Sequence, residues 1–221
     1  MMNNFFSVFD PSTSSLISLN WFSSFFSLAF APFLFWVSLS RPFKLMKILI
    51  EKLTSEVKIL GAKSFKFISI FMSLFLLIVF NNFLGLHPYI FTSTSHLLIT
   101  LGLSLPFWLA FMFFGWLKNT NHMFAHLTPL GSPLILSFLL VLIETVSNFI
   151  RPISLSVRLM ANIISGHILI SLFSSLMEMG LEIFFPSLLL TSILLLLEYA
   201  VAMIQGYVFM TLLSLYMIEI N

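Results

Sequence analysis

The sequence contains no cysteine and few charged residues. Only 8% of its 221 residues are charged and 59% are hydrophobic, whereas a soluble domain carries about 25% charged residues. Without cysteine, disulfides, thiolate metal sites and thiol catalysis are excluded. The formal net charge of +2 is too small to indicate nucleic-acid binding. This composition predicts a polytopic membrane protein, in which the bilayer replaces a large aqueous core.

Long apolar runs make up most of the chain. A run of about 20 apolar residues is long enough to cross the hydrocarbon layer as a helix. We expect a first span over 16–40, followed by spans over 67–84 and 97–117. With the two longer segments described next, the predicted fold class is all-α. We expect the chain to form a single membrane domain over 1–221 with about five membrane-crossing helices.

The last two apolar segments are too long for upright helices. At about 1.5 Å per residue, 133–177 would measure about 67 Å and 186–218 about 50 Å, against a hydrocarbon layer of about 30 Å. We therefore expect a long, steeply tilted helical hairpin that turns near Gly180. Pro152 should bend the first helix because it removes one backbone hydrogen bond. Pro186 is expected in the first turn of the second helix.

A basic segment, 41–66, separates the first two spans. It carries seven Lys and Arg residues, and its apolar residues recur at helical spacing. This pattern predicts an amphipathic helix on a membrane face or against a partner, or a solvated helix that only fixes the topology. The positive-inside rule places this segment and Lys118 on the inner side of the membrane, which is the matrix or its bacterial equivalent, with the N-terminus outside and the C-terminus inside. The start shows no transit-peptide pattern, which fits synthesis inside an organelle.

Two arginines interrupt the first of the long segments. A charge within the bilayer costs at least about 2.5–3.5 kcal/mol, so such residues are candidates for function. Spacings of four and seven residues place a set of polar side chains on one helical face. The set comprises Glu144, Asn148, Arg151, Arg158, Asn162 and Ser165. His167 faces the opposite direction from Arg158.

A second polar stripe runs along the last helix. Its members lie at multiples of seven residues and are Thr191, Glu198, Gln205 and Glu219. Carboxylates and imidazoles can carry protons, whereas arginine stays protonated. The two stripes therefore indicate proton carriers on either side of a fixed positive barrier. Gln205 cannot titrate, and we expect it to hydrogen-bond Arg158 and position it.

An antiparallel hairpin brings residues of the two stripes to the same depth. From the outer side inward, the predicted levels are His167 with Glu198, Arg158 with Gln205, and Glu144 with Glu219. Arg151 is expected to pair with Glu144 or to reach the interface by snorkelling. Structural roles also stay open, since Glu198 could hydrogen-bond a buried hydroxyl and His167 could be a satisfied core histidine.

The stretch around the arginines resembles the signature of subunit a of rotary F-type ATP synthases, also called ATPase subunit 6. The matching residues are Glu144, Ser147, Arg151, Pro152, Leu155, Arg158, Leu159, Ala161, Asn162, Gly166 and His167. Segments 82–89 and 125–133, and Glu198, Gln205 and Tyr207, also resemble this family, and the opening residues 4–11 resemble arthropod mitochondrial versions. His87 and Ser165 depart from the usual pattern of the family.

The resemblance implies a proton-conducting stator subunit of the membrane Fo sector of ATP synthase. Two offset half-channels would serve a rotating c-ring, with the essential Arg158 between them. The implied proton path is His167, Glu198, Glu144 and Glu219, supported by Gln205, Asn162, Arg151 and Ser165. The implied partners are the c-ring, peripheral-stalk subunits including subunit b, other Fo subunits and the lipid bilayer.

The resemblance further implies the mitochondrial inner membrane, with the N-terminus in the intermembrane space and the C-terminus in the matrix. We expect no cofactor and no nucleic-acid partner. The chain lacks a nucleotide-binding motif, so it is not expected to be an enzyme on its own, and ATP chemistry belongs to its partners.

Other functions are compatible with parts of the pattern. An ion-coupled secondary transporter could also bury Arg, Glu and His, but it should show a repeat or a broken helix pair. A purely structural anchor leaves the two polar stripes unexplained. A haem protein with two axial histidines would need them in the membrane, and no spanning segment carries two. His122 and His126 have metal-ligand spacing, but ordinary surface histidines are the expectation because no further ligand is evident.

Overall fold

The computed structural model describes residues 5–13, 18–29, 41–59, 65–87, 89–128, 134–177 and 180–220. Every regular element in these ranges is helical. Among the described residues, four helices are long and apolar enough to cross a membrane, namely α3 (Phe65–Gly85), α4 (Leu97–Lys118), α6 (Leu134–Met177) and α7 (Leu181–Ile220). The shorter elements are η1 (Phe5–Phe9), η2 (Leu19–Phe22), α1 (Ser23–Ala29), α2 (Arg41–Ile59), η3 (Ser93–Ser95) and α5 (Thr120–Leu127). The prediction of an all-α, polytopic membrane protein is confirmed.

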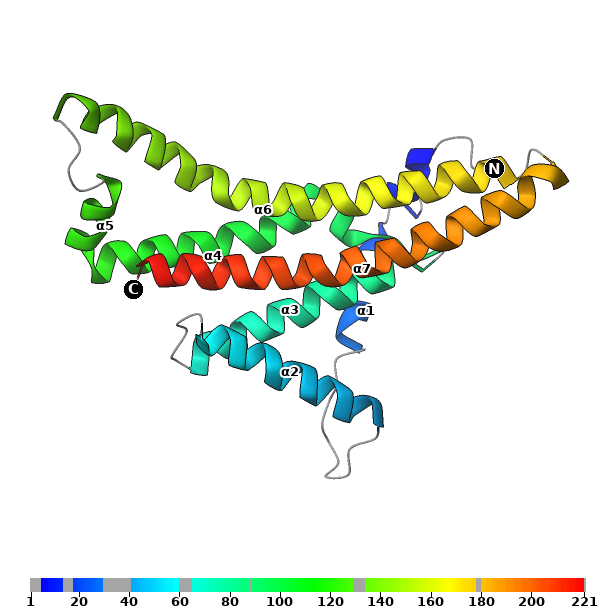
Figure 1. The fold of residues 1–221 in the computed structure, drawn as a ribbon, viewed down its shortest axis with the longest axis horizontal. Helices are drawn as coiled ribbons and strands as arrows, with labels where there is room; N and C mark the ends of the chain where they lie inside the picture. The colour runs from blue at the N-terminus through cyan, green and yellow to red at the C-terminus, as the bar shows by residue number, and fades with distance from the viewer. Residues whose placement is uncertain are drawn as a thin grey trace.

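The two longest helices form the predicted hairpin. Figure 1 shows α6 and α7 running antiparallel, with the first part of α6 bent away from its partner. Pro152 lies inside α6, where its missing N–H weakens the helical ladder and permits this bend. Gly180 precedes α7 and has a φ of +155°, a conformation that favours glycine. We had expected Pro186 in the first turn of this helix. That prediction was wrong, because α7 begins at Leu181 and Pro186 lies beyond the first turn.

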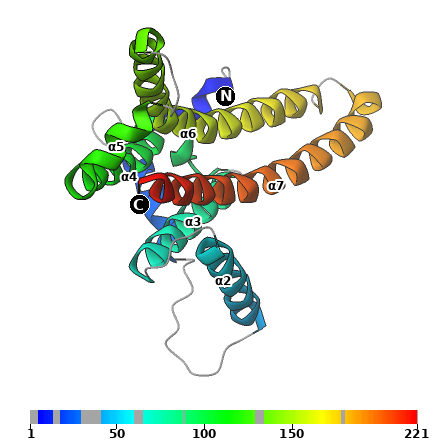
Figure 2. The same cartoon turned by 60° about the vertical axis from the view of Figure 1, so that its left-hand side comes forward.

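The core lies where α3, α6 and α7 meet. Fully buried members include Phe71 of α3, Leu159 of α6 and Met210 of α7. Gly206 allows a close approach here, because a Cβ at that position would lie 2.5 Å from Val79 Cγ2. α4 packs against α6 on another side, as both views in Figures 1 and 2 show. The hairpin therefore has one packed side, whereas much of its apolar surface is exposed in the isolated chain.

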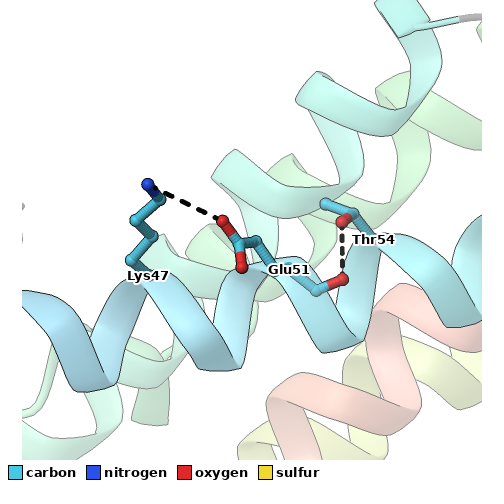
Figure 3. A network of polar contacts seen from close by, with 3 residues as sticks. All are labelled: Lys47, Glu51 and Thr54. Atoms are coloured by element: carbon cyan, nitrogen blue, oxygen red, sulfur yellow. Dashed lines mark hydrogen bonds and ion pairs between the residues drawn. The ribbon is translucent and has the colours of Figure 1, made fainter.

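The basic segment forms α2, which packs on α3 and ends at Ile59. Val57 enters the core, while Lys47 and Glu51 face outward and form an i,i+4 ion pair with 3.9 Å between Nζ and Oε1. Thr54 Oγ1 donates to the backbone oxygen of Glu51 at 2.8 Å, and Figure 3 shows both contacts. The prediction of an amphipathic helix agrees with α2 over 41–59. Residues 60–64 of the predicted helix lie outside the described residues. Its predicted end was wrong, because residues 65 and 66 begin α3.

Candidate functional site

The polar stripes of α6 and α7 meet along the hairpin. Asn162 Nδ2 donates to Gln205 Oε1 at 3.0 Å. One turn further along α6, Gly166 lies against the Glu198 carboxyl group, and a Cβ at Gly166 would collide with it. Glu198 and Gln205 are buried, with exposed fractions of 6% and 5%. Two stripes recognised separately in the sequence therefore form one seam between the helices.

Arg158 lies on the exposed side of this seam. Among the described residues its side chain makes no hydrogen bond or ion pair. We had placed Gln205 opposite Arg158, but its hydrogen bond is with Asn162, one turn closer to the hairpin turn. Two amides satisfy each other as donor and acceptor within the seam. The guanidinium is left available to a group outside this chain.

Arg151 has a different environment from Arg158, although both lie on the same helix. Its Nη2 is 3.7 Å from Glu144 Oε1, which is one of the two arrangements that the sequence left open. Its guanidinium carbon also lies 5.4 Å from the ring centroid of Tyr216 on α7. The two charged side chains are partly exposed, at 29% for Arg151 and 41% for Glu144. An ion pair held on an aromatic ring thus fixes the carboxylate in place.

This ion pair borders a cleft of about 490 Å³ between α4, α5, α6 and α7. The lining residues are Trp108, Phe111, Met112, Trp116, Met123, Leu127, Glu144, Thr145, Asn148, Phe149, Arg151 and Tyr216. The polar groups are contributed mainly by α6. The cleft is therefore large enough for several water molecules around a carboxylate.

A second, smaller cavity of about 150 Å³ lies between α6 and α7 nearer the hairpin turn. Its lining residues are Asn162, Ser165, Gly166, Leu169, Ile170, Leu194, Leu197, Glu198 and Val201. Ser165 Oγ donates to the Asn162 backbone oxygen at 3.1 Å. Along α6, Arg158 falls between the residues that line the two cavities, and it lines neither.

His167 faces away from the second cavity, as its position on the helix predicted. Its ring meets the edge of Phe9 from η1, with centroids 6.1 Å apart and planes at 89°. The imidazole also approaches the backbone of Gly85 at the end of α3. Its Nε2 is buried and has no hydrogen-bond partner among the described residues. Since Gly166 touches Glu198, the imidazole and the carboxylate lie at adjacent levels of the hairpin.

Some predicted residues lie outside what the structure describes. The side chain of Glu219 is one of them, and so are those of His122 and His126 on α5. Within the described ranges, no group of three or more metal-ligating side chains occurs.

Two contacts of the site were not anticipated from the sequence. Phe9 and Tyr216 supply the rings against His167 and Arg151. Phe9 lies outside both polar stripes, and Tyr216 lies off the seven-residue stripe of the last helix, so no sequence signal singles them out. Only the fold brings the N-terminal and C-terminal parts of the chain to these two places.

Comparisons with known proteins cover the whole chain. The family model for the ATP synthase A chain matches residues 17–218. The chain is 51% identical to ATP synthase subunit a of Anopheles quadrimaculatus and of Drosophila melanogaster, and 48% identical to that of Locusta migratoria. Each alignment covers 100% of both proteins. The chain therefore belongs to the ATP synthase subunit a family and is similar to its insect members.

Proposed function

We propose that this subunit a conducts protons through the Fo sector of ATP synthase in the mitochondrial inner membrane. It would act as the stator beside a rotating c-ring, with two offset half-channels separated by Arg158. The observation that carries the proposal is the pair of cavities on the α6–α7 hairpin, one on each side of Arg158 along the helix.

The turn end of the hairpin would form the outer half-channel. The positive-inside rule assigns basic α2 and Lys118 to the matrix side, so the turn near Gly180 faces the intermembrane space. His167 and Glu198 lie at this end, and an imidazole and a carboxylate can each accept and release a proton. Protons taken up here would reach a carboxylate of the c-ring.

The larger cleft would form the matrix half-channel. Glu144 lines it, and Glu219 follows on the last turn of α7. At about 1.5 Å per residue, Arg158 lies about 21 Å along α6 from Glu144 and about 14 Å from His167. These separations are too long for direct proton transfer, so water fills each half-channel.

Arg158 would act as the barrier between the two halves. Its guanidinium stays protonated at any physiological pH, so it repels a passing proton and attracts an ionised carboxylate. Its exposure and its lack of a partner in the described chain leave it free to face the c-ring. The remaining partners would be subunit b and other peripheral-stalk subunits beside α2, other Fo subunits, and the bilayer.

The decisive experiment replaces Arg158 in the assembled synthase. We expect Arg158→Ala and Arg158→Gln to abolish proton-driven ATP synthesis, while the soluble head still hydrolyses ATP. Arg158→Lys should substitute poorly, because lysine lacks the planar fork and can lose its proton when buried.

A matched control is Ser154→Ala, one turn away on the same helix. This exposed hydroxyl donates only to the Arg151 backbone oxygen, at 2.9 Å, so synthesis should stay at the original rate. Near-normal synthesis in Arg158→Ala would refute the role of the arginine.

A further inference from the structure

Three elements that pack together, α3, η3 and α4, carry buried polar groups without partners among the described residues. Asn82, Thr94 and Ser104 are 0%, 1% and 0% exposed. Both amide atoms of Asn82 and the hydroxyls of the other two have no hydrogen-bond partner among the described residues. They belong to α3, η3 and α4, and η3 packs against both helices and against α6. Buried polar groups of this kind are normally satisfied by ordered water.

Two imidazoles reach the same region. His167 belongs to α6, and His96 directly follows η3. The Nε2 atom of each ring is buried and has no partner among the described residues. Gly85 lies between the two histidine environments. On one side, the imidazole of His167 approaches the backbone of Gly85. On the other side, a Cβ at Gly85 would lie 3.0 Å from Thr92 Cγ2. The segment that carries His96 therefore folds against the residue that His167 touches.

The N-terminal segment holds both imidazoles with aromatic rings. The ring of Phe9 contacts His167. The ring centroids of Trp21 and Phe91 lie 5.1 Å and 5.2 Å from that of His96. Ser23 Oγ donates to the Phe91 backbone oxygen at 3.0 Å and ties α1 to this group. In both views η1 lies beside the turn-proximal half of α6 (Figures 1 and 2), and α1 packs against α3. Aromatic contacts orient these rings without occupying the buried Nε2 atoms.

Helix capping does not account for a histidine at this position. His96 is the N-cap residue of α4, but its side chain makes no capping hydrogen bond. Serine, threonine, aspartate or asparagine would cap the helix better. The imidazole lies against the rings of Trp21 and Phe91, and its buried Nε2 has no partner among the described residues.

We propose that His96 is a second proton-carrying imidazole of the outer half-channel, upstream of His167 and Glu198. This proposal rests on the proposed function. The neutral ring accepts a proton at one nitrogen from water on the outer side and becomes an imidazolium. It then gives a proton to water held by Asn82, Thr94 and Ser104 and returns to the neutral form, so no other reactant is consumed.

The test is made in the assembled synthase. His96→Gln keeps a polar side chain but cannot carry a proton, and we expect proton-driven ATP synthesis to fall about tenfold with normal assembly. The matched control is His87→Gln. His87 is an exposed histidine at the other end of the same loop, and its ring centroid lies 6.5 Å from that of Tyr199. This control should keep the original rate.

Chemical rescue separates proton transfer from packing. In His96→Gly, imidazole added on the outer side should restore synthesis, whereas pyrazole, a ring of the same size and a far weaker base, should not. Equal rescue by both rings would assign His96 to packing and overturn the proposal. An unchanged rate in His96→Gln would also overturn it if His167→Gln and Glu198→Gln remain impaired. If these two variants also kept the original rate, the outer half-channel itself would be refuted.

Discussion

Two arginines seven residues apart on one helix have different environments. The guanidinium of Arg151 has its partners within the chain, the carboxylate of Glu144 and the ring of Tyr216. Arg158 has an exposed guanidinium and no ionic partner among the described residues. A cation inside the membrane needs a counter-charge, because hydrocarbon cannot solvate it. We therefore expect the counter-charge of Arg158 to come from a neighbouring subunit.

A single methyl group tests how closely the two helices must approach. A Cβ at Gly166 would collide with the Glu198 carboxyl group, so Gly166→Ala must displace that carboxylate. We expect proton-driven ATP synthesis to fall at least about tenfold, in keeping with the loss of a general acid–base group. The readout is synthesis by the assembled complex, with the amount of assembled subunit measured in parallel.

Gly102→Ala is the matched control for this substitution. Gly102 also lies in a membrane helix, and a Cβ there would meet nothing within 4 Å. The control should leave synthesis unchanged. If Gly166→Ala also left it unchanged, the closeness of α6 to Glu198 would have no functional meaning.

The residue-level predictions succeeded where a helical period links the partners. The seven-residue spacing offered a pair of Arg151 with Glu144 as one of two arrangements, and the structure has this pair. The partner of Gln205 lies on another helix, and its identity depends on the register of the hairpin to within one turn. Periodicity does not fix that register, so the prediction named Arg158 where the structure has Asn162.

At the level of elements, α2 is held by apolar residues that pack on the core and by a polar contact with α7. Val57 is 0% exposed in the core, and Tyr207 Oη donates to Glu56 Oε2 at 3.1 Å. The ion pair between Lys47 and Glu51 adds little, because exposed pairs contribute at most about 1 kcal/mol. The helix is therefore fixed through its apolar side, and its lysines face away from the core.

The exposed lysines of α2 offer a test of topology and partner. A cross-linker reactive with amines, applied from the matrix side, should join Lys52 or Lys58 to a subunit outside the c-ring. The reason is that α2 would lie on the matrix face beside the peripheral stalk. Mass spectrometry of the products identifies the partner. Products formed only with reagent on the outer side would overturn the proposed orientation.

Helix boundaries show why element-level prediction has a limit. The start of α6 at Leu134 agrees closely with the predicted 133, because the loop before it is rich in proline and glycine. The start of α7 was placed at Pro186, because proline favours a first turn. The structure begins the helix at Leu181 instead, after the glycine with positive φ. A turn set by Gly180 therefore overrides the local preference of proline.

At the level of the whole molecule, helix length requires a tilted hairpin. The 44 residues of α6 and 40 of α7 would span about 66 Å and 60 Å upright, roughly twice the hydrocarbon thickness. A steep tilt carries one polar seam from one membrane face to the other beside a single partner surface. Two cavities can then open to opposite sides while remaining offset along the seam.

This offset predicts different accessibility on the two sides of Arg158. Because the natural sequence has no cysteine, Thr145→Cys in the larger cleft and Leu169→Cys in the smaller cavity each introduce one thiol. A membrane-impermeant thiol reagent should label Thr145→Cys only from the matrix side and Leu169→Cys only from the outer side. Ile153→Cys, which lines neither cavity, should resist labelling from both sides because lipid or the c-ring covers it. Labelling of either cavity position from both sides would mean that one continuous water path passes Arg158. Such a path would dissipate the proton gradient without turning the ring, and the two half-channels would have to be abandoned.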